Sequence, residues 1–180
     1  VSQDIKDLQT AWLFLGWQTA GVQNKKDFVT LKVMNTILGS GMSSRLFRNL
    51  REQDGLAYQL GSSYSPKMLG GSFFTYIGTN PETLEYYSRK KILHEIDRFK
   101  MEFVSDTELK DAKDRLKGSF VIAMETNSEK ASNIGLFETY GFGYDFLNEY
   151  VKMIDQVTAS DIISVANKYF NNIIIQSEVK

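Results

Sequence analysis

The chain of 180 residues lacks cysteine and has one histidine, His94, which excludes disulfides, thiolate metal sites, cysteine nucleophiles and any zinc centre built on two imidazoles. Lys plus Arg (21) nearly balance Asp plus Glu (22), and the net charge of −1 gives no electrostatic reason to expect a nucleic-acid partner. No apolar run approaches the roughly 20 residues that a membrane span requires, so we expect no membrane partner.

The organisation of the chain is that of one continuous unit. It has two prolines and no linker rich in Ser and Gly, which predicts a single domain over residues 1–180. The beginning, Val1-Ser2-Gln3-Asp4, is neither an initiator Met nor a signal peptide, and we expect it to be a cut inside a longer protein. The lack of cysteine is compatible with the cytoplasm or the periplasm.

The first third of the chain predicts a strand followed by two helices. Residues 11–17 form a short apolar run rich in aromatics, which is typical of a strand buried on both faces. Apolar residues at helical spacing predict a helix over residues 28–38 that ends at Gly39. Ser43 or Ser44 can cap a second helix, which would end at Gly55 in the left-handed conformation.

After Gly55 the period of the pattern changes to two. Alternation over residues 58–64 and again over 72–78, with a connection at 66–71, predicts an antiparallel hairpin. Asn80-Pro81 is a strong helix start, and the spacing of Ile92, Ile96, Phe99 and Phe103 predicts the buried stripe of that helix.

The remaining chain predicts more helices and a last strand. Ser105-x-x-Glu108 and Thr126-x-x-Glu129 are capping-box patterns, and Thr158 begins the final helix. A strand over residues 173–179 follows. The order predicts an α+β fold, a mostly antiparallel sheet with helices packed on one face.

Two motifs that suggest a ligand are better explained structurally. His94-Glu95 could open a zinc-protease helix motif, but Arg98 stands where the second His is needed. The segment 39–44 (GSGMSS) resembles a phosphate cradle, yet it lacks the P-loop lysine and lies between two helices instead of after a strand. We therefore expect no metal or cofactor site in this chain, and a tight helix–helix turn at residues 39–41.

Arg51 and Tyr58 are the candidate catalytic residues. Arg51 should lie in the last turn of the second helix and Tyr58 at the beginning of the next strand, so the turn at Gly55 could bring a guanidinium and a phenol to one rim. Arg presents a fork of donors that suits a peptide carbonyl, and Tyr can donate to a developing oxyanion. From spacing alone, structural roles for both residues remain open.

The sequence LGSGMSSRLFRNLREQDGLAYQLGSSYS, residues 38–65, strongly resembles the signature of the C-terminal domain of insulinase-type (pitrilysin, mitochondrial processing peptidase) zinc metallopeptidases. GGSFFTYIGTNPE (70–82) and VTASDIISVANKYF (157–170) agree with the flanking and closing segments of that family. The resemblance implies a ferredoxin-like half of a closed-chamber peptidase, the C-terminal, zinc-free half of a longer chain or complex.

In this family, the N-terminal half carries the zinc motif and the C-terminal half supplies an Arg and a Tyr spaced R-x6-Y. Arg51 and Tyr58 occupy these positions, which implies substrate-binding and oxyanion-stabilising roles. The resemblance implies a catalytic N-terminal half as partner, with zinc in that missing half, and a peptide substrate, and it leaves room for a homodimer of the full protein.

Two other functions remain open at this point. One is a non-catalytic structural or assembly subunit of the same fold, and the other is a peptide-binding module that uses an exposed sheet edge. The short turn at residues 39–41, in place of the long glycine-rich loop of the non-catalytic processing-peptidase subunit, favours an ordinary peptidase half. The presence of both Arg51 and Tyr58 points the same way.

Overall fold

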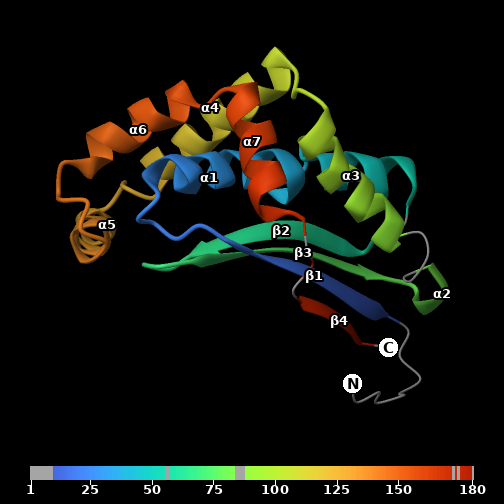
Figure 1. Cartoon of the computed structure of the whole chain (residues 1–180). Helices are drawn as coiled ribbons and strands as arrows, with labels where there is room; N and C mark the ends of the chain where they lie inside the picture. Colours follow the sequence, from blue (N-terminus) through green and yellow to red (C-terminus); the bar gives the residue numbers. More distant parts are fainter. Residues whose placement is uncertain (1–9, 56, 84–87, 172, 174, 180) are drawn as a thin grey trace.

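A four-stranded antiparallel sheet forms the base of the molecule in the computed structural model, which describes residues 10–55, 57–83, 88–171, 173 and 175–179 (Figure 1). Its strand order is β2 (Gln59–Pro66), β3 (Gly71–Thr79), β1 (Ala11–Thr19) and β4 (Ile175–Val179). Every neighbouring pair is antiparallel, so β1 and β2 run in the same direction on either side of β3. This is the ferredoxin-like arrangement, and the predicted α+β fold is confirmed.

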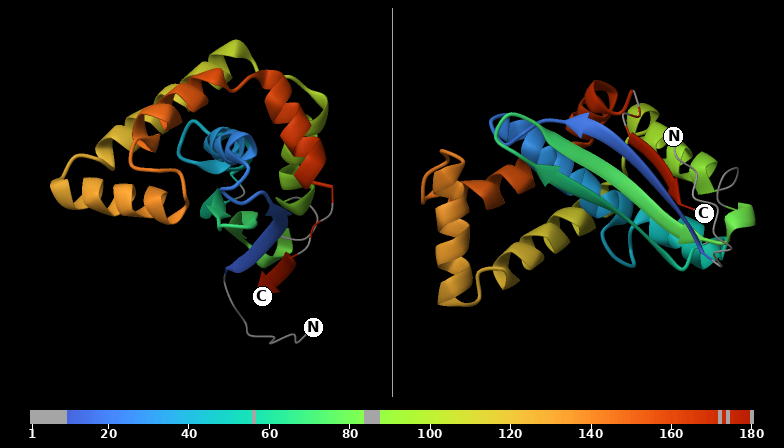
Figure 2. Two further views of the ribbon diagram at one scale, coloured as in Figure 1. Left: turned by 60° about the vertical axis from the view of Figure 1, so that its left-hand side comes forward. Right: turned by 90° about the horizontal axis from the view of Figure 1, so that it is seen from below.

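The long helices gather on one face of this sheet, as Figures 1 and 2 show. Helix α1 lies against the sheet, and the others arch around it. These helices are α1 (Lys25–Gly39), the π-helix η1 (Phe47–Gln53), α3 (Arg89–Met101), α4 (Asp106–Ile122), α5 (Asn127–Thr139), α6 (Phe146–Gln156) and α7 (Ala159–Tyr169). The short helix α2 (Pro81–Thr83) follows the end of β3. Within the described ranges, no helix combines the length and the apolar character needed to cross a bilayer.

The core lies between the sheet and these helices. Leu13, Leu15 and Trp17 of β1 alternate with residues of the other face and are buried, and Phe73 and Ile77 of β3 join them. Burial on both faces, predicted for residues 11–17, is wrong in part. The second face of β1 carries half-buried aromatic rings, because the described helices cover only one side of the sheet.

Three helix predictions differ from the structure in detail. The second helix forms a π-helix, η1, instead of an α-helix. The helix that starts at Asn80-Pro81 appears as α2 and α3, and residues 84–87 lie outside the described part of the chain. Phe103 is exposed and lies beyond the end of α3, since that helix ends at Met101 and the chain becomes extended at Glu102.

The starts predicted for α4, α5 and α7 are confirmed, whereas no side-chain hydrogen bond among the described residues caps η1 and the hydroxyl of Ser44 donates to the carbonyl oxygen of Gly41 at 2.6 Å instead. Ser105 accepts a hydrogen bond from the backbone N–H of Glu108, while Thr126 and Thr158 each form a full capping box with the third residue of their helices. Each cap satisfies backbone donors that the helix itself leaves unpaired. These caps fix where α4, α5 and α7 begin.

Gly39 sets how closely α1 approaches β2. A Cβ atom at this position would lie 2.3 Å from the backbone nitrogen of Ser62, far inside van der Waals contact. We expect Gly39→Ala to destabilise the fold by about 1–3 kcal/mol, because the backbone of α1 or β2 must shift.

Gly118 in α4 is the matched control, since a Cβ atom there would meet nothing within 4 Å. Gly118→Ala should stabilise the chain by about 0.5–1 kcal/mol through helix propensity. Urea unfolding of both variants measures the difference. If both substitutions change the free energy of unfolding by the same small amount, the contact between α1 and β2 at Gly39 is not tight.

Candidate functional site

The segment that carries Arg51 is a π-helix followed by a left-handed turn. Arg51 lies in the last turn of η1, as predicted, and Gly55 has φ +63°, the conformation that the sequence predicted for it. A left-handed residue ends the helical path at low cost when it is glycine. A π-helical stretch is rare in proteins and is frequent at functional sites, so this segment differs from the α-helices around it.

The guanidinium of Arg51 is exposed and has no carboxylate partner among the described residues. It lies over the ring of Phe47, one turn earlier in η1, with 5.1 Å between the guanidinium carbon and the ring centroid. Arg51 also lines a cavity of about 360 Å³ together with Phe47, Met42, Gln59 and Tyr76. The donors of the guanidinium are therefore available to a ligand in this cavity.

Tyr58 stands immediately before β2 and is fixed by its backbone. Its N–H donates to the carbonyl oxygen of Gly78 at 2.9 Å, which pairs it with β3. The side chain is 65% exposed, so the phenol is not buried in the core. Tyr58 is not among the residues that line the Arg51 cavity. The structure thus leaves both side chains at the surface, at the two ends of the turn around Gly55, and brings only Arg51 to the cavity wall.

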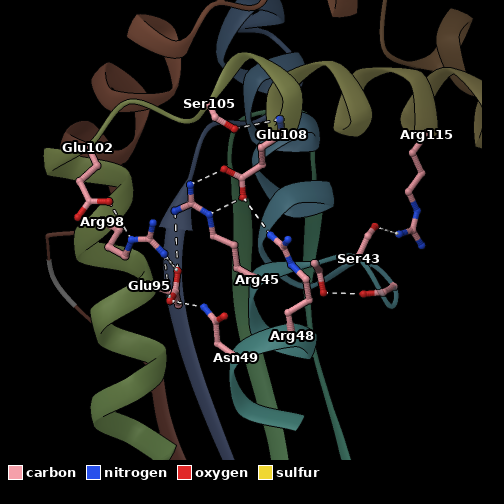
Figure 3. Close-up of polar contacts among 12 residues, drawn as sticks. Ser43, Arg45, Arg48, Asn49, Glu95, Arg98, Glu102, Ser105, Glu108 and Arg115 are labelled. Carbon is pink, nitrogen blue, oxygen red and sulfur yellow. Dashed lines mark hydrogen bonds and ion pairs between the residues drawn. The ribbon is translucent and has the colours of Figure 1, made fainter. Parts of the chain in front are cut away.

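A buried polar network holds η1 in place (Figure 3). Arg45, just before η1, donates from Nε and Nη2 to the two carboxylate oxygens of Glu108 in α4, at 2.7 Å each. Asn49, within η1, donates to Glu95 in α3 at 2.7 Å. The side chains of Arg45 and Glu95 are only 4% and 5% exposed. The network therefore ties the segment that carries Arg51 to two helices at once.

Further contacts within this network neutralise the carboxylate of Glu95. Arg98 donates to Glu95 at 3.2 Å and to Glu102 at 2.9 Å, and Nη1 of Arg45 lies 3.8 Å from Glu95. The guanidinium of Arg45 also lies over the ring of Phe99, 4.7 Å from its centroid. Bidentate Arg–carboxylate pairs fix geometry as well as charge, so the path of η1 is set by directional contacts and not by packing alone.

The uncovered face of the sheet carries a cluster of aromatic rings. Trp12 and Phe14 of β1 stack with 6.1 Å between ring centroids, and Tyr76 of β3 lies 6.4 Å and 6.3 Å from them. Phe74 extends the cluster along β3 and lines an adjoining cavity of about 610 Å³ beside Phe14. Tyr76 also lines the Arg51 cavity, so the aromatic face and that cavity are continuous.

Two motifs of the sequence can now be placed. His94 is exposed on α3, and Glu95 beside it belongs to the buried network. In the described part of the chain, no group of three or more His, Cys, Asp or Glu side chains could hold a metal ion. Residues 39–44 form a turn, in which the guanidinium of Arg115 packs against Gly41 and donates to Ser43 at 3.2 Å. The interpretation as a helix–helix turn is confirmed.

Sequence reasoning missed the network and the aromatic face. Arg45 and Asn49 lie in the segment that it examined, but no spacing rule connects them with Glu95 or Glu108, which are 46 and 63 residues away from their partners. The aromatic face had a visible signal, because the period-two alternation of the two strands places Phe14 opposite Tyr76 once β1 pairs with β3.

Comparisons with known proteins give consistent results. The family profile of the peptidase M16 inactive domain matches residues 1–116. An uncharacterized zinc protease of Rickettsia felis is 35% identical over 170 residues, which cover 93% of this chain and 40% of the relative. A second uncharacterized zinc protease, from Bacillus subtilis, is 30% identical over 165 residues, 92% of this chain and 40% of the relative. The chain thus spans about 40% of the length of these curated relatives.

Solved structures share the fold over almost the whole chain. A protease from Helicobacter pylori matches with a TM-score of 0.82 and 25% identity, over 97% of this chain and 41% of that one. An inactive peptidase domain from Bordetella parapertussis matches with a TM-score of 0.73 and 15% identity, over 96% of this chain and 94% of that one. The second comparison shows that a unit of this extent and fold forms without a companion half in the same chain.

Proposed function

Since the chain belongs to the peptidase M16 inactive-domain family, we propose that it is the zinc-free, C-terminal half of a two-half zinc metalloendopeptidase that cleaves peptides in a closed chamber. The observation that carries this proposal is the exposed guanidinium of Arg51, which has no carboxylate partner among the described residues and lines a cavity beside η1, with the exposed phenol of Tyr58 across the turn. The relatives are named zinc proteases, and the described residues of this chain offer no zinc site. The proposal therefore assigns zinc to the other half.

In this proposal, zinc on the other half supplies the activated water for peptide-bond hydrolysis, and this chain holds the peptide. Arg51 donates two parallel hydrogen bonds to backbone carbonyl groups of the substrate and orients it. The phenol of Tyr58 donates a hydrogen bond to the carbonyl oxygen of the substrate, which becomes negatively charged as the carbonyl carbon turns tetrahedral. Such a donor lowers the barrier because it binds the transition state more strongly than the substrate.

The uncovered aromatic face supports a partner half. Trp12, Phe14, Phe74 and Tyr76 form a contiguous apolar surface without charged residues among them, a kind of surface that soluble proteins usually cover. Since this face continues into the Arg51 cavity through Tyr76, a half that packs against the rings would bring its own residues opposite Arg51. The proposal places the catalytic half there.

The test is to join the zinc-motif half of the parent protein to this chain and to assay cleavage of a quenched fluorescent peptide. We expect cleavage that stops when a chelator removes zinc and returns when zinc is added back. Arg51→Ala in the joined protein should abolish cleavage without releasing the other half. A joined, zinc-loaded protein that cleaves no peptide of a diverse library would favour the non-catalytic assembly subunit instead.

A further inference from the structure

A third cavity lies at the far end of β2 from the candidate site. It has a volume of about 440 Å³, is open to solvent on one side, and is lined by residues of α1, the end of β2, and the helices α4, α5 and α6. Phe28, Phe120, Leu136 and Phe137 contribute the apolar part of its wall, and polar groups contribute about as much of the surface. A cavity of this size and lining suits a small organic ligand with an apolar body.

Lys32 of α1 is the distinctive residue of this cavity. It lines the wall, and its Nζ lies 6.0 Å and 5.7 Å from the ring centroids of Phe28 and Tyr64, which line the same wall. The described residues give Lys32 no ion pair and no side-chain hydrogen bond. Burial lowers the pKa of its ammonium below the ordinary value, and no neighbouring charge offsets that effect.

The residues around the cavity provide no counter-ion for the Lys32 ammonium in the described part of the chain. The lining contains a second ammonium, that of Lys67, and no carboxylate among the described residues. The phenols of Tyr64, Tyr140 and Tyr150 also line the cavity, and burial raises the pKa of Tyr64 and Tyr150, which keeps these two phenols neutral. A partly desolvated cation without a counter-ion among the described residues is costly to keep, whereas the buried Arg45 and Glu95 described above are paired.

We propose that this cavity binds a carboxylate that carries an apolar body, with the Lys32 ammonium as its counter-ion and the aromatic wall around its apolar part. The hydroxyl groups of Ser63, Tyr140 and Tyr150 line the same cavity and supply further donors to the carboxylate. The site is separate from Arg51 and Tyr58, which lie where β2 begins, so it does not depend on the proposed function. Its carboxylate can come from a free organic acid or from the parent protein's other half.

The test uses the 180-residue chain, since a unit of this extent and fold forms alone. The probe is 3-phenylpropionate, with the neutral 3-phenylpropanamide as its isosteric control, and binding is followed by NMR of the lysine Cε–Hε groups. We expect saturable binding of the acid but not of the amide. The Lys32 pKa should rise toward the ordinary value in the complex, because the carboxylate stabilises the charged ammonium.

Lys32→Met should weaken binding of the acid by about 10- to 100-fold, because it removes the charge and keeps the aliphatic stem. Lys67→Met is the matched variant in the same cavity, and it should change binding by less than about threefold, since its exposed ammonium is screened by water and salt. Circular dichroism is expected to show both variants folded. Equal binding of acid and amide, equal affinity in Lys32→Met, or no saturable binding at all would overturn the proposal.

The joined two-half protein distinguishes the two sources of the carboxylate. If 3-phenylpropionate also binds to the joined protein, and the Lys32 pKa is below the ordinary value when no acid is bound, the natural ligand comes from outside the protein. If the Lys32 pKa is ordinary and the acid does not bind, a carboxylate of the other half occupies the cavity. A low Lys32 pKa together with no binding of the acid would contradict the proposal for the parent protein.

Discussion

Replacing Tyr58 by Phe in the joined, zinc-loaded enzyme is expected to lower kcat by about 10²–10³-fold, the usual loss when one oxyanion donor is removed. The phenol is 65% exposed and its ring can stay where it is, so the thermal midpoint of unfolding should not change. We expect kcat and kcat/KM to fall together, because the hydrogen bond forms only in the transition state. Steady-state kinetics with one peptide substrate measures both.

Tyr144 provides the control for this variant. It is 71% exposed and follows α5, and it lines no part of the Arg51 cavity, so Tyr144→Phe removes an equivalent phenol without touching the candidate site. Its kinetics should equal those of the unmodified enzyme. Turnover that is also unchanged in Tyr58→Phe would remove Tyr58 from the mechanism and leave Arg51 as the only contribution of this chain.

The largest expected effect on stability comes from the buried network. Arg45→Met removes the guanidinium that Glu108 binds through both oxygens and that lies 3.8 Å from Glu95. We expect the free energy of unfolding to fall by about 3–5 kcal/mol, because two largely buried carboxylates lose their compensating charge. That loss is a large part of the roughly 5–15 kcal/mol that stabilises a typical domain. Urea denaturation of the chain measures it.

A surface ion pair gives the comparison. Lys110 and Asp114 in α4 form a pair at 2.8 Å with side chains 75% and 49% exposed, and Lys110→Met should cost less than about 1 kcal/mol. The double variant Arg45→Met with Glu108→Gln should be less destabilised than the sum of the single ones, since the partners are coupled. Additive losses would mean that Arg45 contributes by packing on Phe99 and not through its charge.

The network also explains how stability and activity connect at this site. Asn49 and Arg51 are two residues apart on η1, so the contact of Asn49 with Glu95 constrains the helix that presents the Arg51 guanidinium. A π-helical segment is rare, and here side-chain contacts to α3 and α4 hold it in place. A variant that weakens the network should therefore displace the Arg51 guanidinium while the chain as a whole is still folded.

The sequence was sufficient for local features with short-range causes. The caps at Thr126 and Thr158 and the turn at Gly55 depend on residues within four positions of one another, and each prediction is confirmed. The alternation over residues 72–78 also predicted a strand, because a strand has a fixed period of two, and β3 spans Gly71–Thr79.

Features that depend on tertiary contacts could not be predicted in this way. The π-helical form of η1 is one of them, since its stabilising partners Glu95 and Glu108 come from distant helices. The position of Lys32 in a cavity without a carboxylate among the described residues is another, because a lysine at helical spacing looks like any exposed one until β2 and the helices come together around it. The proposed roles of Arg51 and Tyr58 rest on the resemblance, and their exposure in the structure is consistent with those roles.

The pairing of β1 with β4 has a consequence for how this molecule forms. These strands join residues from the two extremes of the chain, Trp12 with Val179 and Gly16 with Ile175. During synthesis the outer edge of β1 has no neighbour until residues 175–179 have been made, more than 150 residues after β1 itself. An unprotected strand edge invites pairing with other chains, so the nascent protein is exposed to aggregation through β1 until β4 has formed.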